Sequence, residues 1–334
     1  MVKFTNIFNN KVILVTGGTG SFGNAFLEKT LRLSKPKKLI VFSRDELKQF
    51  EMSKKYKSPK LRFFLGDVRD HNRLLQAFRG VDIVVHAAAL KQVNAAEYNP
   101  EEYIKTNVNG AQNVINAAIQ SKVSKVLALS TDKASNPINL YGVTKLCSDK
   151  LFVAANSLSG PNGTKFSIAR YGNVSGSRGS VLPLFKKLLK EKSSFLPITD
   201  KKMTRFWISL DEAYHFVCMC IKNMNGGEIF IPKLPSIKII DLANALDKNI
   251  KKKFVGIKPG EKLHETMFTE MDSPNILEFK NYFIITPNIN FFKKKNNFYF
   301  NKSGEKGKKI NKERSYSSKN NFFLKEKELK KFIS

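Results

Sequence analysis

A tyrosine and a lysine lie four residues apart at Tyr141 and Lys145. A helix would place both side chains on one face, about 6 Å apart along its axis. A phenol normally titrates near pH ~10, and a neighbouring ammonium favours the phenolate. The pair therefore predicts a general base that removes a proton from an alcohol.

An acid and a second amine lie just upstream of this pair. Asp132 and Lys133 follow the apolar run 125–130, which is typical of a buried strand. Ligands bind at the carboxyl ends of strands in parallel sheets. An acid, an amine and an activated tyrosine so close in sequence indicate more than one proton transfer.

Each of these residues also has a structural interpretation. Lys133 could be a solvated lysine at a strand end, and Asp132 could only cap the next element. Thr131 could orient a ligand or simply complete the strand. Asn107, on the helical stretch after residues 105–106, is expected to hold backbone geometry rather than contact a ligand.

A glycine-rich turn near the N-terminus has the order strand, turn, helix. Residues 11–16 form an apolar run, Gly17, Gly20 and Gly23 are spaced three apart, and residues 24–33 are helical in pattern. The glycines permit a tight turn, and the helix N-terminus suits a pyrophosphate. The alternative is a turn that binds nothing, which the flanking strand and helix disfavour.

Strands and helices then alternate along the chain. Further strands are expected at 38–42, 61–65, 81–85, 126–129 and 166–169, and helices between them include 73–78 and 110–120. This alternation predicts an α/β fold with a Rossmann-type, doubly wound parallel sheet over residues 10–172.

The end of the second strand bears on the choice of dinucleotide. NAD enzymes usually place an acidic residue there to hold the ribose, whereas this chain has Ser43. The adjacent Arg44 has a guanidinium suited to a 2′-phosphate, so NADP is favoured. Asp45 and Glu46 keep NAD as an alternative. Asp67, after the third strand, is expected beside the adenine.

Several longer motifs carry a family resemblance. They are residues 43–48, 66–70, 86–91, 134–141, 170–174, 203–207 and 259–264. With them, residues 8–286 resemble the extended short-chain dehydrogenases/reductases, and more narrowly the inverting UDP-N-acetylglucosamine 4,6-dehydratases. That family begins pseudaminic acid synthesis for flagellin and surface glycans. The triplet 131–133 separates it from hexose-nucleotide dehydratases, which generally have Glu at position 133, and from 4-epimerases.

The resemblance implies an NADP-dependent lyase. It would dehydrate UDP-N-acetylglucosamine at C4/C6 with inversion at C5, giving UDP-2-acetamido-2,6-dideoxy-β-L-arabino-hex-4-ulose. Tyr141 would take the 4-hydroxyl proton, and Lys145 would hold the nicotinamide ribose and lower the tyrosine pKa. Lys133, neutral near pH 7, would take the C5 proton, and Asp132 would protonate the leaving 6-hydroxyl. A nucleotide-sugar 4-epimerase and a decayed, non-catalytic binding protein are the alternatives.

The family positions also imply two sets of binding residues. The expected cofactor-binding residues are Gly17, Thr19, Gly20, Ser21, Phe22, Gly23, Ser43, Arg44, Glu46, Lys48, Asp67, Val68, Ala87, Ala89, Thr106, Tyr141, Lys145 and Val174. The expected substrate-binding residues are Lys91, Ser130, Asn173, Arg178, Val181, Arg205, Lys258 and Glu261. Three positions depart from the family: Lys258 replaces an arginine, and Gln92 and Asn94 replace His and Pro.

The chain is expected to divide into two lobes and a tail. Residues 1–173, with 206–231 returning to them, would bind NADP. Residues 174–205 and 232–290 would bind the UDP-sugar. Residues 291–334 read as a basic, partly disordered tail, in which the aromatics near Tyr316 could dock on the body or on a neighbouring subunit.

The net charge of +30 would ordinarily suggest nucleic acid or an anionic membrane. The excess is lysine and accompanies abundant asparagine, as an AT-rich genome would produce, and no nucleic-acid-binding motif is present. The sequence has no metal-ligand spacing, no apolar stretch of ~20 residues and no secretory signal. A cytoplasmic homo-oligomer with free cysteines, no metal, no nucleic-acid partner and no membrane contact is expected.

Overall fold

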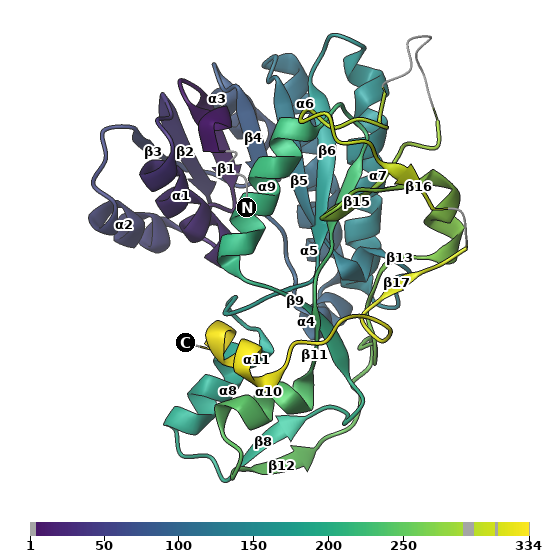
Figure 1. Ribbon diagram of the computed structural model, residues 1–334. Coiled ribbons are helices and arrows are strands. Elements are labelled where there is room, and N and C mark those ends of the chain that lie inside the picture. Colours follow the sequence, from purple (N-terminus) through teal and green to yellow (C-terminus); the bar gives the residue numbers. More distant parts are fainter. Residues whose placement is uncertain (1–4, 290–296, 311–312, 334) are drawn as a thin grey trace.

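The computed structural model describes residues 5–289, 297–310 and 313–333. A large lobe is built on one sheet, and a smaller lobe lies beyond the ends of its strands (Figure 1). The residues that carry the expected chemistry lie where the two lobes meet.

The main sheet confirms the doubly wound α/β prediction. Its parallel strands lie in the order β3-β2-β1-β4-β5-β6-β10. Their bounds are β1 Val12–Thr16, β2 Lys38–Ser43, β3 Leu61–Leu65, β4 Ile83–His86, β5 Lys125–Thr131, β6 Lys165–Tyr171 and β10 Ile229–Pro232. The sequence order reverses between β1 and β4, which is where ligands bind in such sheets.

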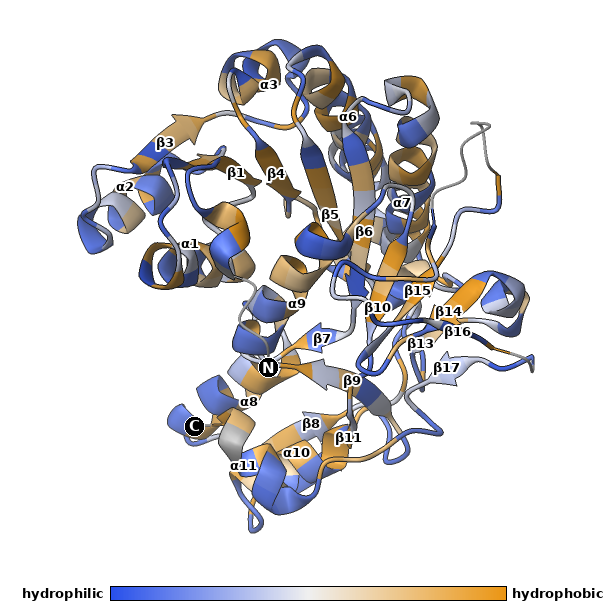
Figure 2. Ribbon diagram, turned by 45° about the horizontal axis from the view of Figure 1, so that its top comes forward, coloured by the Kyte–Doolittle hydropathy of each residue, from blue (hydrophilic) through white to orange (hydrophobic). Residues whose placement is uncertain are grey.

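Helices cover both faces of this sheet. On one face are α1 (Ser21–Leu33), α2 (Glu46–Lys55) and α9 (Leu210–Asn223), and on the other α3 (His71–Phe78), α6 (Gly110–Gln120) and α7 (Leu140–Ser159). Successive residues of β1 alternate between the faces, so that Ile13 packs in one core cluster and Leu14 in the other. Both residues are fully buried, as expected for a strand covered on both sides. Apolar residues accordingly concentrate on the strands in Figure 2.

Short helical segments complete the connections. They are η1 (Thr5–Phe8), α4 (Val93–Tyr98), α5 (Pro100–Tyr103), the π-helical turn η2 (Ile104–Asn109), η3 (Asp132–Ala134) and η4 (Glu270–Asn275). Ala96 and Tyr103 from α4 and α5 pack with Tyr141 in a small apolar cluster. Helices α4 and α5 therefore form the wall behind Tyr141.

The smaller lobe has its own core. It contains α8 (Val181–Lys190), α10 (Ile239–Leu246), α11 (Glu326–Ile333) and the parallel pair β8 (Phe195–Ile198) and β12 (Lys251–Phe254). Leu182, Trp207, Leu242 and Leu329 pack in one buried cluster. A three-stranded sheet joins the lobes and consists of β7 (Asn173–Val174), β9 (Thr204–Ile208) and β11 (Ser236–Lys238).

One expected boundary is corrected. Strands β14 (Ile276–Glu278) and β15 (Tyr282–Ile285), which the sequence assigned to the sugar lobe, extend the main sheet: β15 pairs antiparallel with β10, and β14 pairs antiparallel with β15. Their apolar residues are buried in the core of the large lobe. That part of residues 232–290 therefore belongs to the sheet lobe.

The tail contains more structure than its composition suggested. Within it, β16 (Lys308–Lys309) pairs with β14, and β17 (Tyr316–Ser317) pairs with β13 (Thr266–Phe268). The Tyr316 ring packs against Phe206, Phe268 and Phe283, which confirms that this part of the tail docks on the body. For residues 302–314 the polar composition predicts loop or disorder, and that prediction is wrong at β16. β17 and α11 lie outside that stretch, and the buried Leu329 anchors α11. Residues 291–296 lie outside the described residues.

Candidate active site

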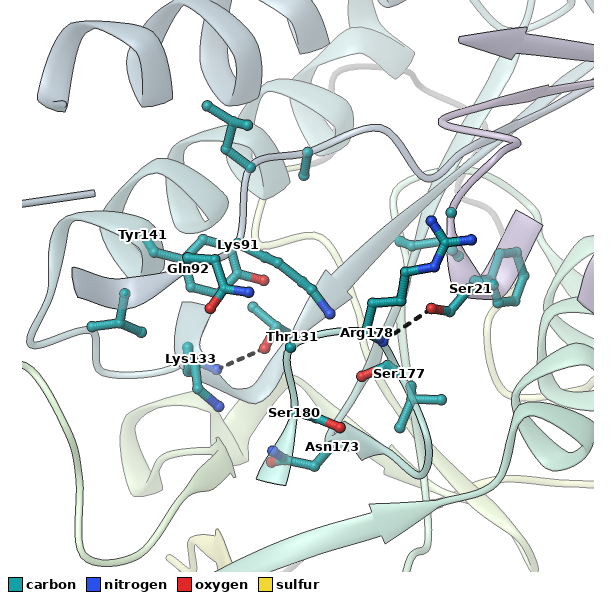
Figure 3. A pocket seen from close by; sticks show the side chains of 18 of the residues that line it. Ser21, Lys91, Gln92, Thr131, Lys133, Tyr141, Asn173, Ser177, Arg178 and Ser180 are labelled. Carbon is teal, nitrogen blue, oxygen red and sulfur yellow. Dashed lines mark hydrogen bonds between the residues drawn. The ribbon is translucent and has the colours of Figure 1, made fainter. Parts of the chain in front are cut away.

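A cavity of about 850 Å³ opens at the carboxyl ends of the parallel strands. Residues of both lobes line it. Figure 3 shows Lys91, Thr131, Tyr141 and Arg178 projecting into it from separate parts of the chain. The cavity therefore occupies the position at which doubly wound folds bind ligands.

Nearly all the residues predicted from the sequence line this cavity. From the catalytic and cofactor sets they are Gly17, Thr19, Gly20, Ser21, Phe22, Gly23, Ser43, Arg44, Lys48, Asp67, Val68, Ala87, Ala89, Thr106, Thr131, Asp132, Lys133, Tyr141, Lys145 and Val174. From the substrate set they are Lys91, Ser130, Asn173, Arg178, Val181, Arg205, Lys258 and Glu261. Glu46 is the exception: it is the exposed first residue of α2 and does not line the cavity, which is a correction.

The turn between β1 and α1 has no room for a side chain at two of its glycines. Gly17 has φ +64°, and a Cβ there would lie 2.8 Å from the Cα of Ala88. A Cβ on Gly23 would lie 2.2 Å from the Gly18 carbonyl oxygen. The turn therefore holds the N-terminus of α1 close to β1, with the backbone exposed to the cavity, as a dinucleotide pyrophosphate requires.

Polar residues follow at the end of β2. The Ser43 and Thr19 hydroxyls lie 3.0 Å apart, and the Arg44 guanidinium lies 3.5 Å from the Asp67 carboxylate. Arg44 is half-exposed, and Lys48 lines the same end of the cavity. Two cations and a hydroxyl are thus available to an anionic group on an adenosine ribose.

The triplet at the end of β5 brings an acid and an amine into contact. The Lys133 ammonium lies 3.0 Å from Oδ1 of the fully buried Asp132. It also lies 3.1 Å from Oε1 of Glu265, which precedes β13. The Thr131 hydroxyl donates to Asp132. It also accepts a hydrogen bond from the Lys133 backbone N–H (Figure 3). Lys133 is therefore held between two carboxylates and is not a solvated strand-end lysine.

These contacts determine the protonation of the cluster. Burial alone would lower the pKa of Lys133, but the carboxylates of Asp132 and Glu265 outweigh it and raise that pKa. Burial raises the pKa of Asp132, although the Lys133 ammonium opposes it. The pKa of Glu265 is lowered despite burial, because Lys133 and Arg205 stabilise its charge. These contacts therefore contradict the prediction that Lys133 is neutral near pH 7.

Tyr141 and Lys145 lie on the first turns of α7, as predicted. Burial raises the pKa of Tyr141 to about 12, and the Lys133 ammonium opposes this rise. The Lys145 ammonium donates a 2.8 Å hydrogen bond to the Leu129 carbonyl, and burial lowers its pKa. Here Lys133, rather than Lys145, is the cation that favours the phenolate.

Several of the expected sugar-binding residues line the same cavity as Lys133 and Tyr141. Arg205 is buried and donates to the backbone carbonyls of Thr204 and Leu263. Burial, followed by the neighbouring Lys133, lowers the pKa of Lys91. The Asn173 Oδ1 is buried without a hydrogen-bond partner among the described residues. These groups leave donors and acceptors available to a polar ligand.

Asn107 and His86, the last residue of β4, have structural roles. The Asn107 amide exchanges hydrogen bonds of 2.8 and 2.9 Å with the backbone of Leu90, which confirms the expectation for Asn107. His86 is buried, and its Nδ1 lies 2.8 Å from the Thr16 hydroxyl. Both residues fix the segment that carries Lys91.

Sequence reasoning missed Glu265. Its carboxylate contacts Lys133, yet it lies one residue beyond the family motif 259–264. A buried Glu cannot be recognised from composition, although its place directly after a recognised motif was an available signal. Gln92, noted only as a departure from the family, also lines the cavity, next to Gly179.

The chain belongs to the polysaccharide biosynthesis protein family, whose model matches residues 13–287. A Campylobacter jejuni relative, "UDP-N-acetylglucosamine 4,6-dehydratase (inverting)", is 57% identical over 329 residues, covering 98% of each chain. These two matches confirm the resemblance drawn from the motifs.

Two solved structures are also similar to the chain. Pen from Bacillus thuringiensis has a TM-score of 0.87 at 37% identity and 98% coverage of both chains. DesIV, a dTDP-glucose 4,6-dehydratase from Streptomyces venezuelae with NAD and TYD bound, has a TM-score of 0.68 at 25% identity, covering 75% of this chain and 86% of that one. Both confirm the Rossmann-type fold.

Proposed function

We propose that this protein dehydrates UDP-N-acetylglucosamine across C5 and C6 after oxidation at C4, with inversion at C5. The product is UDP-2-acetamido-2,6-dideoxy-β-L-arabino-hex-4-ulose, which fits the first step of pseudaminic acid synthesis. The observation that carries the proposal is the Asp132–Lys133 pair beside Tyr141, in one cavity with the dinucleotide turn. The 57% identical relative with the same named activity supports it.

A nicotinamide dinucleotide fits the glycine turn, and DesIV binds NAD in a similar fold. NADP is the proposed form, because Ser43, Arg44 and Lys48 offer a hydroxyl and two cations where a 2′-phosphate would lie. When bound, the cofactor accepts a hydride from C4 and returns one to C6, so the reaction has no net redox change.

Tyr141 serves as the base for the 4-hydroxyl. Its raised pKa means that the phenol is protonated at rest, so its proton passes to solvent before the oxidation and leaves the phenolate. The Lys133 ammonium favours the phenolate, and the Lys145 ammonium, anchored to Leu129, is placed to hold the cofactor ribose. The proton of the sugar hydroxyl then passes to the phenolate oxygen.

Asp132 and Lys133 carry out the loss of water. The ammonium first gives a proton to the carboxylate 3.0 Å away, leaving a neutral amine and a carboxylic acid. Burial favours this uncharged pair, whereas the attraction of the Asp132 and Glu265 carboxylates favours the ammonium that is present at rest. The amine then takes the C5 proton, which the C4 ketone acidifies, and the acid protonates the 6-hydroxyl, which leaves as water. The ammonium and the carboxylate are thereby restored.

Inversion requires the new C5 proton to arrive on the opposite face. After the elimination, the Lys133 ammonium and the Tyr141 phenol both hold a proton, and they share this step in our proposal. If Tyr141 donates, it returns to the phenolate that begins the next cycle. If Lys133 donates, the neutral amine takes a proton from solvent, which balances the one that Tyr141 released at the start.

We assign the cofactor to the sheet lobe, residues 1–173 with 206–231, to which β14–β16 belong. The UDP-sugar is assigned to the lobe containing α8, α10 and β8, where Arg178 and Arg205 supply cations for the diphosphate. The homo-oligomer implied by the resemblance stays a prediction, which light scattering after size-exclusion chromatography tests. No helix among the described residues could span a membrane.

The product assay tests the proposed activity. The protein is incubated with UDP-N-acetylglucosamine and NADP in deuterated water, and the product is examined by NMR and mass spectrometry. We expect loss of one water and deuterium at C5 with inverted configuration. A 4-epimer that retains its 6-hydroxyl would instead establish an epimerase, and unchanged sugar would favour a non-catalytic binding protein.

A further inference from the structure

Glu265 is a buried carboxylate in the wall of the cavity. It is 1% exposed and comes from the segment just before β13, far in sequence from the β5 triplet. Its Oε1 lies 3.1 Å from the Lys133 ammonium and 3.8 Å from Nε of Arg205. Glu265 therefore contacts both the proposed base and a proposed phosphate-binding residue.

The backbone of Glu265 is fixed by the C-terminal segment. Its N–H donates a 2.9 Å hydrogen bond to the Ser318 hydroxyl, and its carbonyl accepts a 2.8 Å bond from the Ser318 N–H. The Ser317 hydroxyl also donates to that carbonyl. These bonds continue the β13–β17 pairing (Figure 1), so the carboxylate is presented from a rigid support.

Glu265 also balances charge in the cavity wall. Lys133 and Arg205 are both cations, and the Arg205 charge acts against the Lys133 ammonium. Without Glu265, Asp132 would be the one carboxylate in contact with the Lys133 ammonium among the described residues. A buried cation without full compensation is strongly unfavourable, so Lys133 would be expected to move away or lose its proton.

We propose that Glu265 is a positioning residue, which anchors Lys133 between itself and Asp132 so that the amine can reach both the Asp132 carboxylate and C5 of the sugar. This inference rests on the proposed dehydratase activity. The Oε2 atom of Glu265 makes no hydrogen bond among the described residues. One carboxylate oxygen therefore contacts Lys133, while the other stays available. A purely structural carboxylate in a buried site would normally satisfy both oxygens.

Two substitutions separate placement from charge. Glu265→Asp keeps the charge but shortens the side chain. We expect it to slow water loss about 100-fold. The acid limb of its pH profile, the fall in the rate of water loss at acidic pH, should stay at the wild-type position. Glu265→Gln keeps the size but removes the charge. Because the Glu265 charge raises the pKa of Asp132, its loss should move the acid limb to lower pH. Oxidation at C4 should persist in both variants. It is measured through the absorbance of the reduced cofactor.

The inference is overturned if Glu265→Asp eliminates water at the wild-type rate, or if Glu265→Gln leaves the pH profile unmoved. Thermal unfolding of both variants shows whether they are folded. If the Glu265→Gln variant is not folded, the rate of water loss in the Glu265→Asp variant decides the question. Failure of the dehydratase proposal is separately visible, because the wild-type protein would then give no dehydrated product.

A readout without turnover completes the test. Labelling of Lys133 by acetic anhydride, measured by mass spectrometry across a pH series, reports the pH at which the amine becomes neutral. In Glu265→Gln, Lys133 should react at lower pH than in the wild type, while the exposed Lys202 should react equally in both. Identical Lys133 profiles would refute the anchoring role whatever the reaction catalysed.

Discussion

Lys145 donates a 2.8 Å hydrogen bond to the backbone carbonyl of Leu129. The bond ties α7, which carries Tyr141, to the strand that ends in the Thr131-Asp132-Lys133 triplet. The proposed base for the oxidation and the proposed acid–base pair for the elimination are thus held by one junction. Lys133 is the cation that opposes the raised pKa of Tyr141, so the two proposed steps are electrostatically linked.

Replacing Lys133 by Ala should therefore affect both steps. Water loss should fall by about 10²- to 10⁴-fold, because the C5 base is gone. Oxidation at C4 should persist but need higher pH, because the pKa of Tyr141 rises further without the ammonium. Rapid-mixing measurements of cofactor reduction across a pH series test this. Lys202→Ala, at an exposed lysine, is the control, and an unaffected Lys133→Ala variant would refute the mechanism.

Arg44 should set the preference between the two dinucleotides. Arg44→Ala should weaken NADP binding by about 1.5–3 kcal/mol, the usual value of a hydrogen bond to a charged group, and NAD binding by less. Titration of both cofactors by calorimetry provides the comparison. Arg62→Ala serves as a control, because Arg62 bonds the Pro59 and Leu61 carbonyls outside the cavity. An equal loss for both cofactors would argue against a 2′-phosphate contact.

The buried pair of Arg170 and Asp149 should stabilise the fold. Their charged atoms are 3.0 Å apart, and both side chains are almost fully buried. Arg170→Met should lower the free energy of unfolding by about 3–5 kcal/mol, since it leaves the Asp149 charge uncompensated. Urea unfolding measures this. Lys187→Met, which breaks the exposed pair with Glu191, should change stability by no more than about 0.5 kcal/mol.

His86 should make stability depend on pH. Burial, with a further contribution from Lys145, lowers the pKa of His86 from 6.5 to about 3. The unfolded chain therefore binds a proton that the folded chain excludes, and the stabilisation is present above pH 6.5 and lost as the pH falls toward about 3. Urea unfolding at several pH values should show a smaller decline for His86→Gln than for the wild type. Parallel declines would contradict this assignment.

The parallel sheet was predictable because its strands are short apolar runs separated by helical patterns. The expected strand at 61–65 and helix at 110–120 match β3 and α6 residue for residue. The antiparallel strands β14 and β15 were not recognised as part of that sheet. They come late in the chain, and the pairing of β15 with β10, which joins both strands to the sheet, is a long-range contact that no local pattern encodes.

The residues of the candidate site that lie within recognisable sequence motifs were predictable. Tyr141, Lys145, Asp132 and Lys133 all line the cavity, as their spacing and strand-end position indicated. The protonation of Lys133 was not predictable, because it depends on Glu265, which approaches from more than a hundred residues away in sequence. Local sequence indicates which groups titrate, whereas the balance between burial and charge emerges only from the folded arrangement.

The hydrogen bonds between Ser318 and Glu265 also impose an order on biosynthesis. A nascent chain emerging from the ribosome can pair its first six strands and form the dinucleotide turn before residue 318 has been translated. It lacks the partner that fixes Glu265 until that residue emerges. Catalytic competence should therefore arise only after residue 318 has left the ribosome, well after the nucleotide-binding half has folded.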